Sequence, residues 1–128
     1  MKTIVRIILF LWQLPQNILG ALLVLILEPE IAFPWNGVRI HYAQRMHGGI
    51  SLGRYVIVAN RFLQIGDSEK HEYGHCRQSK MLGPLYLIVV GLPSLLWAAF
   101  YRDNEADPNG YYRFFTEKWA DRLGGVNR

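Results

Sequence analysis

Two long apolar stretches frame the chain, and polar residues and shorter apolar runs lie between and after them. The first stretch covers residues 4–27 and the second covers residues 85–101. Each contains a Leu-Pro step, at Pro15 and at Pro93, and a proline removes a backbone donor and bends or ends a helix. We therefore expect each stretch to form two short helices that meet at its proline, as a broken hydrophobic hairpin.

The segment between the apolar stretches has the composition of short strands. Residues 37–44 (GVRIHYAQ) and 53–62 (GRYVIVANRF) are rich in Val, Ile and Tyr, and a further short strand is expected at residues 50–52. Gly48 and Gly49 mark a turn before that short strand. These patterns predict a small β-sheet.

Two helices are expected on either side of the second apolar stretch. An aspartate or serine at residues 67–68 can cap the first helix, which runs to about Leu82 and stops at a Gly-Pro step. The second is expected to begin at residues 107–109, where Asp, Pro and Asn offer a cap and a first-turn proline, and to run to Leu123. Helices and strands together predict an α+β fold.

Composition and charge favour a membrane partner over nucleic acid. Apolar residues make up 51% of the chain and charged residues 19%, which excludes a disordered chain. The net charge of +4 is spread out and no nucleic-acid-binding motif accompanies it. We therefore expect a lipid bilayer with anionic headgroups as a partner, and no nucleic acid. Lys2 and Arg6 favour a cytoplasmic N-terminus.

The strongest chemical signal is the sequence HEYGH, which begins at His71. Residues i and i+4 of a helix share one face, so His71 and His75 can offer two imidazoles to one metal ion. Glu72 lies about 100° round the helix, close enough to accept a proton from a water molecule on that metal. A catalytic zinc ion also needs a third protein ligand and an open coordination position.

The third ligand is best supplied downstream, by the sequence EKWAD. Glu117 and Asp121 are again four residues apart on one helical face. Glu117 can be the third ligand, and Asp121 can accept a hydrogen bond from the far nitrogen of a ligand histidine. Ala120 is small and would let the two helices approach closely. The remaining histidines lie upstream in the strand region: His41 and His47.

Together the two motifs resemble those of the gluzincin metallopeptidases, which carry H-E-x-x-H on one helix and E-x-x-x-D on a second. The chain is most similar to the minimal members, the minigluzincins, and to membrane peptidases of the heat-shock and CAAX-processing kind. The resemblance covers residues 55–125 by order of elements and is specific only at the two motifs. It implies a minimal zincin-like domain in which a Zn²⁺ ion has three ligands: His71, His75 and Glu117. It also implies Glu72 as general base and acid.

The resemblance further implies that a substrate peptide adds as a strand to an exposed sheet edge. A strand within residues 47–59 could serve, because such pairing needs exposed backbone rather than particular side chains. Peptide hydrolysis also needs a donor that stabilises the oxyanion, besides the metal. Tyr112 is the preferred donor because it lies near Glu117 in sequence, and there are three further candidates: Tyr111, Arg113 and His47. The sequence identifies no other substrate-binding residue.

The domain organisation follows from these elements. Residues 1–34 are expected to form a hydrophobic membrane-anchoring segment broken at Pro15, and residues 35–128 a zincin-like catalytic domain with an inserted hydrophobic hairpin at 84–101. The hairpin cannot cross a bilayer once, because the two metal-binding motifs must meet on one side. The first segment is long enough to cross, but its polar break suits a hairpin equally well. The preferred interpretation is a monotopic anchor, with catalysis on the cytoplasmic face.

The sequence therefore predicts a membrane-associated zinc metalloendopeptidase. It would hydrolyse peptide bonds of peptides or membrane proteins through a zinc-bound water activated by Glu72. Two alternatives stay open. The chain could be a non-catalytic zinc-binding membrane interaction protein, or a small membrane-perturbing protein in which the motif is accidental.

Overall fold

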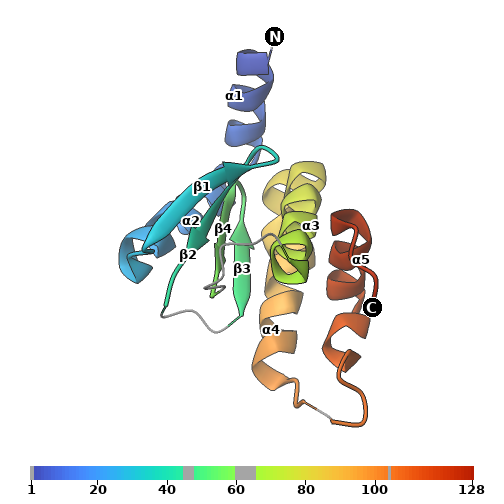
Figure 1. The fold of residues 1–128 in the computed structure, drawn as a ribbon. Coiled ribbons are helices and arrows are strands. Elements are labelled where there is room, and N and C mark those ends of the chain that lie inside the picture. Colours follow the sequence, from blue (N-terminus) through green and yellow to red (C-terminus); the bar gives the residue numbers. More distant parts are fainter. Residues whose placement is uncertain (1, 45–47, 60–65, 104) are drawn as a thin grey trace.

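The computed structural model describes residues 2–44, 48–59, 66–103 and 105–128, which form five α-helices and a four-stranded mixed sheet (Figure 1). The predicted α+β class is confirmed. The α-helices are α1 (Lys2–Trp12), α2 (Leu14–Leu27), α3 (Asp67–Leu82), α4 (Leu92–Phe100) and α5 (Phe115–Gly124). The strands are β1 (Ile31–Trp35), β2 (Val38–Tyr42), β3 (Gly49–Leu52) and β4 (Tyr55–Val58). Short turns of other helical types cover Gly83–Leu85, Leu87–Gly91 and Gly110–Arg113.

The sheet has the order β1-β2-β4-β3, in which β2 and β4 are parallel and the other pairs are antiparallel. Three strands are confirmed, although residues 60–62 of the predicted strand at 53–62 lie outside the described part of the chain. The first strand, β1, was not predicted. It pairs with β2 across a tight turn in which Asn36 and Gly37 have positive φ angles of 50° and 81°. Gly48 lies in the expected turn, whereas Gly49 already begins β3.

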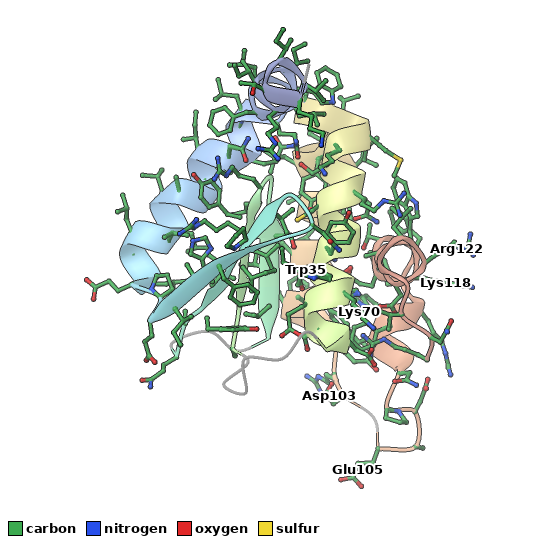
Figure 2. All side chains as sticks on the ribbon, turned by 45° about the horizontal axis from the view of Figure 1, so that its top comes forward. Trp35, Lys70, Asp103, Glu105, Lys118 and Arg122 are labelled. Atoms are coloured by element: carbon green, nitrogen blue, oxygen red, sulfur yellow. The ribbon has the colours of Figure 1, made fainter. Side chains whose placement is uncertain are left out.

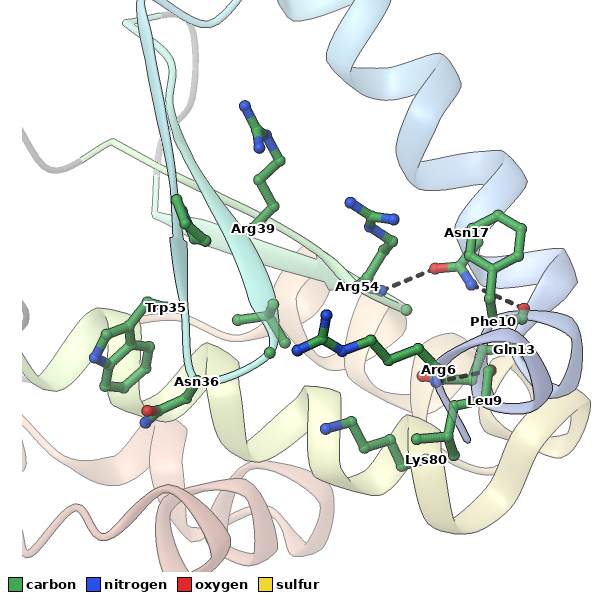
Figure 3. A pocket seen from close by; sticks show the side chains of 14 residues that line it. Arg6, Leu9, Phe10, Gln13, Asn17, Trp35, Asn36, Arg39, Arg54 and Lys80 are labelled. Carbon is green, nitrogen blue, oxygen red and sulfur yellow. Dashed lines mark hydrogen bonds between the residues drawn. The ribbon is translucent and has the colours of Figure 1, made fainter. Parts of the chain in front are cut away.

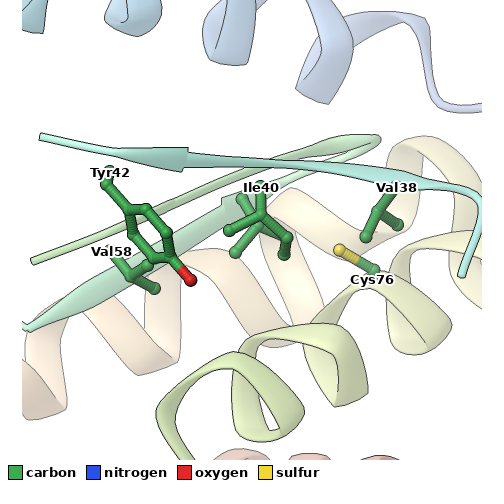
Figure 4. Close-up of a cluster of buried hydrophobic side chains, with 6 residues drawn as sticks. Val38, Ile40, Tyr42, Val58 and Cys76 are labelled. Carbon is green, nitrogen blue, oxygen red and sulfur yellow. The ribbon is translucent and has the colours of Figure 1, made fainter. Parts of the chain in front are cut away.

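Helices cover both faces of the sheet. Alternate residues of a strand point to opposite faces, so one face gathers the apolar cluster shown in Figure 4. The cluster packs against α3 through the buried Cys76, and its sheet members are Val38, Ile40, Tyr42, Val56 and Val58. Helix α2 packs on the other face, where Gly20 touches Tyr55. The sheet therefore forms a rigid layer between α2 and the helix that carries the histidine motif.

The first apolar stretch breaks where its proline predicts. Helices α1 and α2 meet at Gln13 and are bent by 84°. The polar side chains at the break are buried and face α3, where Gln16 donates to the Ser79 hydroxyl at 3.0 Å and Ser79 donates to Gln13 at 2.6 Å. This polar network holds the bent helix pair on the end of α3.

The predicted hairpin within residues 84–101 is wrong. A π-helical turn at Leu87–Gly91 continues directly into α4, so the chain does not reverse at Pro93. The Leu92 N–H bonds to the Leu87 carbonyl, and this wider turn accommodates a proline ring that an α-helical turn would exclude. The reversal lies earlier, where the segment Asp67–Leu85 and the segment Leu87–Phe100 are bent by 119°.

No single helix among the described residues is long and apolar enough to span a membrane. Two bent pairs of helical segments meet that requirement, by length and composition only. One pair is α1 with α2, and the other is Asp67–Leu85 with Leu87–Phe100.

The last helix begins later than its sequence predicts. A 3₁₀ turn covers Gly110–Arg113, Phe114 is extended, and α5 starts only at Phe115. The reason is packing against α4, because the Phe114 ring stacks on Trp97 with centroids 4.7 Å apart. The Trp97 indole N–H also donates to the Tyr111 carbonyl at 2.8 Å. Helix α3 begins at Asp67 as expected, but no side chain at 67–68 caps it.

Candidate metal centre

The histidine motif forms a compact buried group on α3. Ligand atoms of His71, Glu72 and His75 all lie within 4.8 Å of one another, a spacing that could hold a metal ion. The three residues are 5%, 7% and 5% exposed. Helix α3 is regular from Asp67 to Leu82, so the i, i+4 spacing places both imidazoles on one face as predicted.

Helix α5 places the Glu117 carboxylate beside the two histidines. The two helices touch at Gly74 and Ala120, where a Cβ atom added to Gly74 would lie only 1.8 Å from the Ala120 carbonyl oxygen. The close approach expected at Ala120 is therefore confirmed, and it depends equally on Gly74. As a result, Glu117 Oε2 lies 2.9 Å from His75 Nε2 and 3.8 Å from His71 Nε2.

Each histidine ring is oriented by a contact at its Nδ1 atom. Asp121 Oδ1 lies 2.7 Å from His71 Nδ1, as predicted for that carboxylate. The Gln78 side-chain oxygen lies 2.6 Å from His75 Nδ1. Both oxygens are acceptors, so each Nδ1 carries a proton and each Nε2 is the ring nitrogen left to bind a metal ion. The role of Gln78 was missed in the sequence, although its i+3 spacing from His75 is a signal for it.

The two carboxylate oxygens of Glu117 have different surroundings. The Tyr111 hydroxyl donates to Oε1 at 3.1 Å. Oε2 is buried, and its contacts with described residues are the 2.9 Å and 3.8 Å approaches of the two histidine Nε2 atoms, which leave it without an assigned hydrogen bond. Buried polar atoms are otherwise almost always satisfied. A buried carboxylate oxygen that converges with two imidazole nitrogens on one point fits a bound cation, which would replace the proton on His75 Nε2.

Glu72 is held by the sheet instead. The Ser51 hydroxyl on β3 lies 2.7 Å from Glu72 Oε2 and 2.7 Å from the Glu72 carbonyl oxygen, so it can donate to either. Gly49 makes room for the carboxylate, since a Cβ atom there would lie 2.9 Å from Glu72 Oε1. The sequence offered no signal for Ser51, because its contact depends on long-range packing of β3 against α3.

The charges of the site residues shift the pKa values of His75 and Glu117. Burial alone would lower the pKa of His75, but contact with Glu117 and the charge of Glu72 outweigh burial and raise that pKa to about 9. Burial alone would raise the pKa of Glu117, but His75 and His71 outweigh it and lower that pKa. Without a metal, His75 and Glu117 therefore form an ion pair at neutral pH.

Tyr112 and Arg128 form a second layer behind His71. The Tyr112 ring packs edge-on against His71 with centroids 5.1 Å apart. The Arg128 guanidinium lies 3.4 Å from the centre of the Tyr112 ring and bonds to Asp121 Oδ2 at 2.8 Å. The pKa of Tyr112 is raised, mainly by burial. Its predicted part in catalysis stays a prediction.

The other predicted donors are distributed differently. Tyr111 is engaged with Glu117, Arg113 pairs with Asp107 on the surface, and His47 lies outside the described residues. His41 lies in β2, where its ring approaches the Val56 carbonyl rather than the histidine pair.

Comparisons of the chain with protein-family models, with curated proteins and with solved structures found no significant match.

Proposed function

We propose that the chain is a membrane-associated zinc metallopeptidase of the gluzincin type. The observation that carries the proposal is the buried Glu117 Oε2, which has no assigned hydrogen bond and faces the Nε2 atoms of both His71 and His75. Two imidazoles and one carboxylate are a donor set that suits zinc and leaves a coordination position open for catalysis.

Each residue of the site has a separate role in the proposed reaction. His71, His75 and Glu117 would hold the zinc ion. When bound, zinc lowers the pKa of a coordinated water molecule and polarises the carbonyl of the scissile peptide bond. Glu72, whose carboxylate is held by the Ser51 hydroxyl, would accept the proton of the attacking water. The same carboxylate then delivers that proton to the leaving amine.

The substrate proposed is an extended peptide segment that pairs with β3. This strand is at the edge of the sheet and lies against α3 beside Glu72. Its outward backbone groups alternate, and the Ser51 carbonyl already accepts a bond from the Tyr86 hydroxyl at 3.3 Å. The backbone of Gly49, which points to the same side, would pair with the substrate next to Glu72.

Membrane association is supported by apolar side chains that no part of the described chain covers. On α1, Ile4, Ile8 and Leu11 are about 60% exposed, and on α4 Leu95 and Phe100 are 63% and 77% exposed. Exposed apolar surface of this extent marks an interaction site in a folded protein. We propose that these faces lie in one bilayer surface, as a monotopic anchor on the cytoplasmic side, with peptide or membrane-protein segments as substrates.

The test is peptide cleavage by the full chain in detergent or vesicles, with Glu72→Gln as the decisive variant. We expect the wild type to cleave an unfolded protein substrate, and the variant to lose at least about 100-fold in rate while it keeps its zinc ion. Cleavage that continues unchanged in Glu72→Gln would overturn the proposed role of this residue.

A non-catalytic zinc-binding membrane protein is the second candidate. It is favoured by burial, because the four site residues are at most 7% exposed, and closed coordination is typical of structural zinc. Zinc bound without cleavage of any tested substrate would favour this candidate. A chain that binds no zinc at all would leave the membrane-perturbing alternative.

A further inference from the structure

A second site lies away from the metal centre, where α1 meets the sheet. A cavity of about 550 Å³ opens there, a volume suited to a small ligand (Figure 3). It is bordered by α1, by the start of α2, by the β1–β2 turn, by the β3–β4 turn and by the end of α3. No residue of the metal centre lines it.

The cavity lining is strongly cationic. Four basic side chains from four different elements contribute to it: Arg6, Arg39, Arg54 and Lys80. No aspartate or glutamate lines the cavity, and none of the four makes an ion pair with a described carboxylate. Four like charges round one cavity repel one another unless an anion compensates them. Arginine favours phosphate in particular, because its planar guanidinium can donate two parallel hydrogen bonds.

The walls of the cavity are fixed by hydrogen bonds between the elements that form them. Asn17 accepts a hydrogen bond from the Arg54 backbone N–H at 2.8 Å and donates to the Phe10 carbonyl at 3.0 Å. Gly53 has a positive φ of 66°, and any side chain there would collide with Asn17. The Trp12 indole donates to the Lys80 carbonyl at 3.0 Å, which ties α1 to the end of α3. The backbone segments that carry the cationic side chains are therefore held in place without a ligand.

The surroundings of the cavity suit an amphiphilic ligand. Leu9 and Phe10 of α1 line the cavity together with Trp35 on the opposite wall. The remaining faces of α1 carry the exposed side chains of Ile4, Ile8 and Leu11. A helix with apolar residues outside and cationic groups behind it is typical of a segment that lies in a membrane interface. An anionic headgroup could enter the cavity while its acyl chains follow the apolar side of α1.

We propose that this cationic cavity binds the phosphate group of an anionic phospholipid and thereby fixes the chain on the bilayer surface. The ligand chemistry is a phosphate-bearing anion, which a lipid headgroup or a free phosphate ester could supply. The inference does not rest on peptidase activity, because it uses no residue of the metal centre.

The test measures partition of the full chain onto vesicles. One set contains phosphatidylcholine alone and the other also contains phosphatidic acid, and glycerol phosphate is added separately as a soluble competitor. The cavity variant is Arg39→Gln with Arg54→Gln, two exposed positions on the sheet and its turn. We expect the wild type to prefer the anionic vesicles and this variant to lose about 30-fold in partition, at about fivefold per cation near an anionic surface.

A matched control separates the site from general charge. Lys118→Gln with Arg122→Gln removes two positive charges from side chains that project outward from α5 (Figure 2). Both double variants lower the same formal net charge of +4 by the same amount. We expect the control to change partition less than about twofold, because these charges lie outside the cavity and are screened by salt. The thermal unfolding midpoint of each variant, compared with that of the wild type, reports whether the chain remains folded.

The outcomes are distinct. Selective loss in the cavity variant, with glycerol phosphate a poor competitor, supports a lipid ligand. Selective binding of free glycerol phosphate without any preference for anionic vesicles supports the phosphate site and assigns it to a soluble ester. Equal loss in both double variants, or no binding of either phosphate source, overturns the proposal. The variant Glu72→Gln should bind vesicles as the wild type does.

Discussion

Replacing Gly74 by alanine would push apart the two helices that carry the metal ligands. The added Cβ atom would lie 1.8 Å from the Ala120 carbonyl oxygen, and ordinary contact begins at 3.4 Å. Because the neighbour is backbone, α5 would have to retreat by about 1.6 Å, and overpacking of this kind costs about 1–3 kcal/mol. Metal–ligand distances tolerate only about 0.2 Å, so Glu117 could no longer reach a zinc ion held by His71 and His75.

The assay combines thermal unfolding with zinc titration against a competing chelator. For Gly74→Ala we expect a Tm lower by about 4–12 °C and a zinc affinity weaker by more than about 100-fold. Gly91→Ala is the matched control, because Gly91 is helical and a Cβ atom there meets nothing closer than 3.5 Å. That variant should bind zinc as the wild type does. Unchanged zinc affinity in Gly74→Ala would refute the claim that helix contact positions the third ligand.

Three further predictions concern the supports of the site. Asp121→Asn should weaken zinc binding by about 10–100-fold, measured by chelator competition, because the acceptor of His71 Nδ1 loses its negative charge. Zinc binding should release about one proton at pH 7, and its apparent affinity should fall about tenfold per pH unit below about 9, because His75 must lose the proton that its raised pKa retains. Calorimetry in two buffers of different ionisation enthalpy measures the release, and a value near zero would contradict the raised pKa. Ser51→Ala should lower kcat by about tenfold or more with zinc retained, because the Glu72 carboxylate loses its only described support; equal loss of zinc would show a structural role instead.

The site was predictable to the extent that it depends on local periodicity. The spacing of His71 and His75 fixes their common face once the helix forms, and the same holds for Glu117 and Asp121. Ala120 also indicated where two helices could touch. Gln78 could have been recognised by the same rule, since it lies three residues after His75.

The missed features depend on contacts between distant segments. The sequence Asn36-Gly37 is a strong hairpin signal from which β1 could have been predicted. The strand accommodates Pro34 because it lies at the sheet edge. The residues that follow α3 include both Gly83 and Pro93 as possible breaks. The chain reverses between the segments Asp67–Leu85 and Leu87–Phe100, close to the first break, and it absorbs Pro93 after a π-helical turn. Ser51 meets Glu72 only because β3 packs against α3.

Two carboxylates, those of Glu72 and Glu117, lie close enough to the histidines to be the third metal ligand. Glu72 lies within metal-binding distance of both histidines, but its carboxylate is bonded to Ser51. Glu117 instead presents to them an oxygen that has no assigned hydrogen bond. The most direct test is the zinc content of the purified chain, compared with that of Glu117→Gln and Glu72→Gln. We expect one zinc ion per chain in the wild type and in Glu72→Gln, and none in Glu117→Gln. Zinc retained in Glu117→Gln and lost in Glu72→Gln would contradict the assignment of Glu117 as the third ligand.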